Sequence, residues 1–201
     1  MRRFGPTLIA TVAILTARAD AQEHDPPLFA AFKAFCVDTG ASPDAVKSAV
    51  EVAGGKQLSP PGATGKPFPM TVTAWGIIIG GHGMHVSAGT QQIPPAQNRP
   101  EENSNHCIVS SFVNEDSGIE AIRNWVGVAP TIFGNNPISY IFDYQEWGSA
   151  RSTLPADKIA YDKAKVEERI WSLAVNRWQD GVFVQLVHYL APPPPAPQKR
   201  R

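Results

Sequence analysis

Residues 170–190 carry the strongest short-range folding signal in this chain. Two runs rich in β-branched and aromatic residues, 171–178 and 182–190, flank the pair Asp180-Gly181. An Asp-Gly pair between two such runs predicts a tight β-hairpin. A two-stranded hairpin is only marginally stable in water, so the rest of the chain must supply further strands and a helical cover.

The register of this hairpin divides its side chains between two faces. With Asp180-Gly181 as the loop, Val175 is expected opposite Leu186, within a mostly apolar face. The other face is mixed and carries three aromatic residues, Trp178, Phe183 and Tyr189. Exposed aromatic residues commonly mark contact sites, whereas aromatic residues in small domains are mostly buried. This face is therefore expected to be either a partner surface or a second packed face.

Four other segments have the composition or alternation of strands: 70–79, 84–90, 107–113 and 138–145. The first two are expected to form a second hairpin around the glycine-rich turn 80–83. Adjacent strands joined by tight turns predict a mainly antiparallel sheet of about six strands. With an N-terminal helix pair and one or two further helices covering one face, the fold class is α+β.

The helix pair is predicted from apolar spacing and from end signals. Apolar residues three and four apart predict a short helix over residues 28–36. A second helix is expected to begin after Ser42, with Pro43 as its first residue, and to end at Gly54-Gly55. The following residues, 56–69, are rich in proline and are predicted to form a polar connector.

Capping residues and charge patterns indicate further helices in the second half of the chain. Ser117 and Glu120 have the spacing of a capping box, and Gly127 is expected to end that helix. Residues 155–169 fit either a helix with a charged, solvated face or an irregular crossover. Residues 91–105, with three prolines, are predicted to be a long exposed loop.

The N-terminus has the three parts of a secretory signal peptide. Arg2 and Arg3 precede an apolar run of about ten residues, which is too short to span a bilayer, and a small-x-small site ends at Ala21. We expect residues 1–21 to be removed, residues 22–190 to form a single domain, and residues 191–201 to be a disordered, proline-rich basic tail. The alternative is an uncleaved N-terminal anchor.

Charge gives no reason to expect a nucleic acid or an anionic membrane as a partner. The full chain carries 18 basic and 18 acidic side chains, and removal of residues 1–21 leaves a net charge of about −2. Later apolar runs are interrupted before they reach membrane-spanning length, so no membrane span is expected after signal removal. The mature protein is expected to be soluble and periplasmic or secreted.

Both cysteines, Cys36 and Cys107, lie in the expected mature chain. An even count in an oxidising compartment predicts one disulfide across 71 residues, and the chain-entropy model gives such a loop roughly 4 kcal/mol of stabilisation. The alternative is a pair of buried free thiols, which behave as small apolar side chains.

Three histidines are the strongest candidates for a metal-binding site. His82 and His85 lie at the glycine-rich turn with Met84 between them, and His106 precedes Cys107. Imidazole suits zinc, and two histidines with a methionine suit copper. The alternative is a flexible turn with solvated polar side chains. We expect no other cofactor.

The familiar catalytic motifs are absent from the sequence. The chain has no Gly-x-Ser-x-Gly nucleophile elbow, and its Gly80-Gly81-His82-Gly83 run lacks the lysine of a phosphate loop. Acidic residues occur in neighbouring pairs at 101–102, 115–116 and 167–168. Such pairs on loops and helix surfaces are expected to be solvated rather than catalytic.

The segment Phe29-x-x-Phe32-x-x-Phe35-Cys36-Val37-Asp38-Thr39-Gly40, followed by Pro43-x-x-Val46, resembles the start of small exported bacterial proteins that have no assigned function. The resemblance covers the first helix pair and extends loosely to the second cysteine on a strand. It implies export and a paired-cysteine fold, and it transfers no catalytic residue.

Together these patterns predict a non-enzymatic, disulfide-stabilised domain that binds an unidentified envelope protein or ligand through its sheet face or long loops. The alternative is a small hydrolase or metal-binding protein with a site around His82, His85 and His106.

Overall fold

The computed structural model describes residues 25–58, 70–94, 102–131, 138–144, 152–155, 157–178 and 181–191, without the side chains of residues 70, 71 and 178. The predicted signal peptide and all of the predicted tail except Ala191 lie outside these residues. Among the helices that are described, none is long and apolar enough to cross a membrane.

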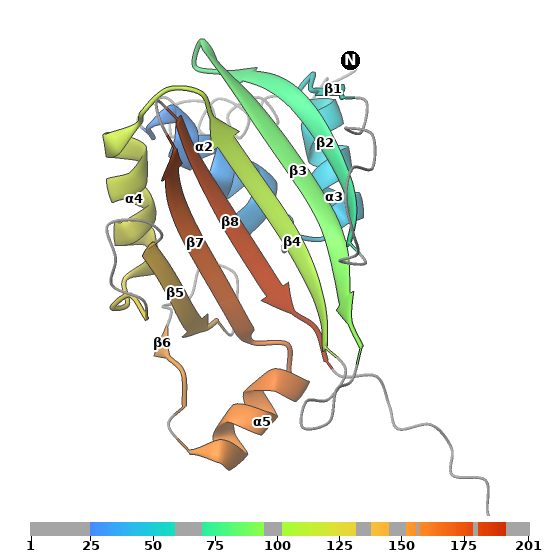
Figure 1. The fold of residues 1–201 in the computed structure, drawn as a ribbon, viewed down its shortest axis with the longest axis vertical. Coiled ribbons are helices and arrows are strands. Elements are labelled where there is room, and N and C mark those ends of the chain that lie inside the picture. The colour runs from blue at the N-terminus through green and yellow to red at the C-terminus, as the bar shows by residue number, and fades with distance from the viewer. Residues whose placement is uncertain are drawn as a thin grey trace, which may run out of the picture.

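One antiparallel sheet organises the described chain (Figure 1). Its strands follow the order β1-β2-β3-β4-β8-β7-β5-β6. Their bounds are β1 Lys56–Gln57, β2 Met70–Ile79, β3 His82–Ile93, β4 Glu102–Ser111, β5 Ile138–Asp143, β6 Ser152–Thr153, β7 Ile170–Trp178 and β8 Gly181–Tyr189. The α+β class and the antiparallel pairing are confirmed.

The expected number of about six strands is too low, because eight are present in the described residues. The two additional strands, β1 and β6, have two residues each and lie at the two edges of the sheet. Two residues are too few to carry an alternating pattern. β1 also lies within the predicted connector 56–69, where Lys56 pairs with Gly76 of β2.

The β7–β8 hairpin is confirmed, but its register differs by two residues from the expected one. Gly181 already belongs to β8 and pairs with Trp178, so Val175 lies opposite Val184 rather than Leu186. A shift of two residues keeps every side chain on its predicted face. The observed register also places Leu173 opposite Leu186, so apolar residues meet across the strands.

The β2–β3 hairpin is tighter and longer than expected. Only Gly80 and Gly81 form its turn, with φ of +55° and +82°, while His82 pairs with Ile79. Two positive φ values are the requirement of a type I′ hairpin turn, which glycine meets without steric cost. Residues 91–93 and 102–105 of the predicted loop 91–105 are strand instead, and Gln91 pairs with Ser104 across β3 and β4.

The helices are α2 Pro27–Phe32, a π-helical turn over Lys33–Val37, α3 Pro43–Val52, α4 Asp116–Val126 and α5 Lys158–Val166. The helix pair and the start of α3 after Ser42 are as predicted, although the Ser42 side chain makes no capping hydrogen bond. The ambiguous segment 155–169 contains α5, whose first turn donates two backbone N–H groups to the Asp157 carboxylate.

The capping box expected at Ser117 and Glu120 is wrong. α4 begins at Asp116, so Ser117 already lies inside the helix, and Glu115 occupies the N-cap position. The end at Gly127 is confirmed, with φ of +68°.

The main core lies between the sheet and the layer that contains α2, α3 and the π-helical turn, which stands behind the sheet in Figure 1. Trp125 of α4 packs edge-on against Phe32, Phe142 and Tyr144. The largest fully buried side chains include Trp75, Phe32, Phe142, Leu28, Met84, Ile119 and Ile122. The Cys36–Cys107 disulfide is confirmed and joins the π-helical turn to β4 inside this core.

Candidate functional site

One face of the sheet is packed against helices. A cross-strand row through its centre contains Trp75, Val86, Val109, Val184 and Val175. All five side chains are buried. They belong to the core formed with α2 and α3.

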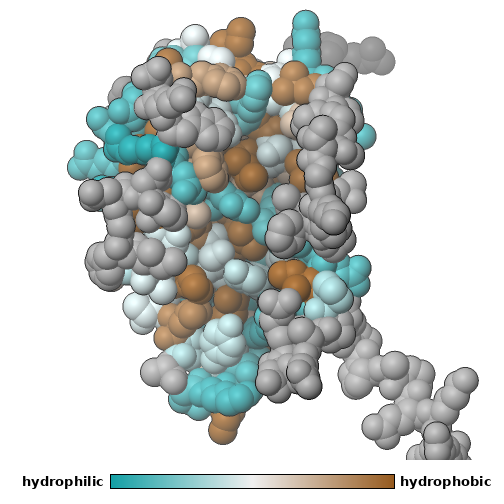
Figure 2. Space-filling model, in the orientation of Figure 1, coloured by the Kyte–Doolittle hydropathy of each residue, from teal (hydrophilic) through white to brown (hydrophobic). Residues whose placement is uncertain are grey.

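The opposite face, here called the open face, consists of the alternate residues of the same strands. Its central row contains Ala74, Ser87, Ile108, Gln185 and Ala174. All five are half-buried. Figure 2 looks onto the side of the molecule opposite α2 and α3, where apolar and polar residues are mixed over the central strands.

The predicted aromatic surface does not form one cluster in the described residues. Phe183 and Tyr189 do lie on the open face, and both are half-buried, but they are six residues apart along β8. That separation is about 20 Å along a strand. The side chain of Trp178 lies outside the described part.

α5 lies at the lower end of the sheet, near the beginnings of β4 and β7 (Figure 1). Its Lys165 ammonium donates to the Glu102 carboxylate at 2.9 Å. A small cavity of about 170 Å³ lies beneath the helix, lined by Ile141, Leu154, Tyr161, Ile170, Tyr189 and this ion pair. Away from this cavity, the open face continues through its half-buried central row to its upper end.

His106 lies on the open face in a hydrogen-bonded group with Ser104 and Gln185. The Gln185 side-chain NH2 donates to His106 Nδ1 at 2.9 Å, so His106 Nε2 carries the ring proton and donates to Ser104 Oγ at 2.9 Å. An imidazole in this tautomer is not a base toward the Ser104 hydroxyl. The group therefore satisfies buried polar atoms instead of forming a catalytic pair.

Burial lowers the pKa of His106 from its ordinary value of 6.5. Because the folded state binds this proton less readily than the unfolded chain, the corresponding stability is present above about pH 6.5 and is lost as the pH falls. We predict that the free energy of unfolding falls less between about pH 7 and about pH 5.5 in His106→Gln than in the wild type. Urea denaturation at both pH values measures this, and equal falls would contradict the prediction.

The three histidines proposed for a metal site are not brought together. His82 is on the helix side of β3, with Nδ1 3.3 Å from the Glu115 carboxylate, whereas His85 is on the open face. His106 lies opposite Gly89, four residues further along β3 than His85. Within the described residues, no three histidine, cysteine or acidic side chains are placed to hold a metal ion.

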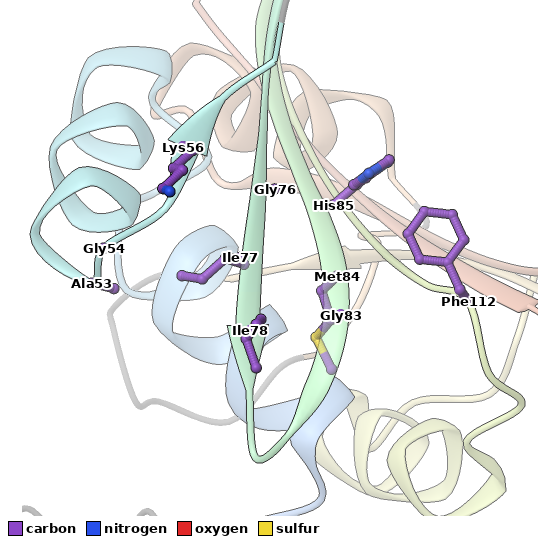
Figure 3. A pocket seen from close by; sticks show the side chains of 10 residues that line it. All are labelled: Ala53, Gly54, Lys56, Gly76, Ile77, Ile78, Gly83, Met84, His85 and Phe112. Atoms are coloured by element: carbon purple, nitrogen blue, oxygen red, sulfur yellow. The ribbon is translucent and has the colours of Figure 1, made fainter.

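A hollow of about 520 Å³ occupies the upper corner of the open face (Figure 3). Two cross-strand rows build it. In one row Gly76 lies between Lys56 and His85. In the next row on this face Ile78 lies opposite Gly83, and Phe112, the residue after β4, lines the hollow from the other side (Figure 3). The glycines leave the backbone as the floor, and the four side chains stand around it.

The motifs in the sequence included Gly83, Met84 and His85 of this hollow, but not Lys56, Gly76, Ile78 or Phe112. The signal that identifies them is the register of the β2–β3 hairpin, which places Gly76 beside His85 and Gly83 beside Ile78. A two-residue turn at Gly80-Gly81 implies these two pairs. The expected four-residue turn over residues 80–83 implies a register shifted by two residues, in which these residues are not opposite each other.

The chain matches no protein-family model, no curated protein and no solved structure.

Proposed function

We propose that this chain is an exported binding domain that contacts another component of the cell envelope through its open face. The observation that carries the proposal is the exposure of large apolar side chains at the upper end of that face. Ile78 is 74% exposed and Phe112 is 51% exposed, and both line the same hollow. Grouped apolar side chains on a surface are typical of contact sites.

The composition of the open face favours binding over catalysis. Its central row is uncharged, and His106 is held in a tautomer that does not activate Ser104. Export is supported by the signal-like N-terminus and by the buried disulfide, because disulfides persist mainly in oxidising compartments. A mass measurement on the protein purified from its host tests export, with cleavage after Ala21 as the expected result.

Site-specific photo-crosslinking tests the binding surface. A benzophenone amino acid at Ser87, in the centre of the open face, is expected to give a discrete adduct in intact cells. The same residue at Lys47, exposed on α3, is the matched control and is expected to give none. Adducts of equal yield from both positions, or none from Ser87, would contradict binding through this face.

A further inference from the structure

The floor of the upper hollow is the backbone around two glycines, Gly76 and Gly83. A Cβ atom built at Gly83 meets no heavy atom within 4 Å, and one at Gly76 meets only Leu58 Cδ2, at 3.5 Å. Both glycines are interior residues of their strands, where glycine is less favourable than a residue with a side chain. Glycine inside a strand often marks a place where another group approaches the backbone closely.

The walls of the hollow combine apolar surface with positive charge. Ile78 and Phe112 flank Gly83, and the Phe112 ring meets the His85 ring edge-on with centroids 4.6 Å apart. Lys56 is on the other side of Gly76 from His85, two strand spacings or about 10 Å away. Of the described residues that line the hollow, none is acidic.

The volume suits a small molecule. Small-molecule sites usually measure about 300–1,000 Å³ and combine apolar walls with a few polar groups that orient the ligand. A hollow of about 520 Å³, in which Lys56 is the one permanently charged side chain among the described lining residues, meets both conditions. A ligand with an apolar body would cover Ile78 and Phe112, and a negative group would balance the lysine.

We propose that this hollow binds a small amphiphilic anion, with an aliphatic body over Gly76 and Gly83 and a carboxylate at Lys56. The body lies between Ile78 and Phe112. The proposal rests on the accessibility of the open face, but it does not require the macromolecular contact proposed above.

Calorimetric titration with decanoate, below its micelle-forming concentration, tests this site. Decanoate is expected to bind with a stoichiometry of one, whereas decylammonium, which has the same chain and the opposite charge, is expected to bind much more weakly. Lys56→Gln is expected to weaken decanoate binding roughly three- to fivefold, as for the loss of one solvent-exposed ion pair. Lys47→Gln on α3 is the charge-matched control and should bind as the wild type does.

Gly83→Val is the decisive variant, because it adds a side chain to the floor at a position where a Cβ atom meets no heavy atom within 4 Å. It is expected to abolish decanoate binding while the thermal midpoint stays equal or rises, since valine is more favourable than glycine in a strand. Wild-type affinity in Gly83→Val, equal binding of decanoate and decylammonium, or no binding of decanoate would each overturn the proposal. A Ser87 photo-adduct that persists in Gly83→Val would show that the macromolecular contact stands without the small-molecule site.

Discussion

Replacing both bridged cysteines by alanine, Cys36→Ala with Cys107→Ala, is expected to lower the free energy of unfolding by roughly 4 kcal/mol. The disulfide closes a loop of 71 residues, so it removes many conformations from the unfolded chain. Both sulfur atoms are in the core, and their removal also leaves small voids. Urea denaturation followed by tryptophan fluorescence measures the change.

Chemical reduction provides the control for this experiment. Wild-type protein unfolded and refolded in reductant should show nearly the stability of the double alanine variant, and reductant should not change the variant further. Cysteine-to-serine variants are less suitable, because a hydroxyl placed in this core adds a desolvation cost of its own. A double alanine variant that unfolds at the wild-type urea concentration would contradict the entropic role of the bridge.

Signals contained within a short stretch of sequence predicted most of the fold. The Asp180-Gly181 pair with its flanking β-rich runs predicted the closing hairpin, and the apolar alternation separated its buried face from its half-buried face. Register was harder to predict, because a shift of two residues preserves every face and changes only which side chains meet. The two-residue edge strands were missed because they depend on a partner strand and have no pattern of their own.

The candidate site depended on information that a linear pattern does not contain. Gly76 and Gly83 matter because β2 and β3 place them in neighbouring rows, seven positions apart in the sequence. The histidines proposed as metal ligands lie apart for the same reason, because their positions depend on strand geometry. Adjacent positions on a strand point to opposite faces, and His85 is three positions after His82, an odd number, so the two side chains face opposite sides.

Glu115 is the clearest case of a residue whose role the sequence did not indicate. It stands in an acidic pair that was expected to be solvated, but it is 7% exposed. Its carboxylate accepts a hydrogen bond from the Leu28 N–H of α2 at 2.8 Å and another from the Ser111 hydroxyl of β4 at 2.8 Å. One side chain therefore connects the first helix, the end of a central strand and the start of α4.

We predict that Glu115→Ala lowers the free energy of unfolding by roughly 3 kcal/mol. Leu28 and Ser111 are fully buried, so the substitution leaves a backbone N–H and a hydroxyl without their acceptor, at about 1–3 kcal/mol each. The carboxylate also lies at the N-terminus of α2, where negative charge is favourable. Urea denaturation measures the loss, and Glu120→Ala, on the exposed side of α4, is the control with a change within about 0.5 kcal/mol.

A double-mutant cycle separates this hydrogen-bonded role from a loss of packing. In a Ser111→Ala background the hydroxyl that donates to Glu115 no longer exists, so Glu115→Ala leaves one buried donor, the Leu28 N–H, without its acceptor instead of two. The contact between Glu115 and the half-exposed His82 is lost equally in both backgrounds. The cost of Glu115→Ala should then be smaller than in the wild type by about 1 kcal/mol. If the two substitutions were instead additive, the Ser111 hydroxyl would not contribute to the loss, and the hydrogen bond between Ser111 and Glu115 would not stabilise the fold.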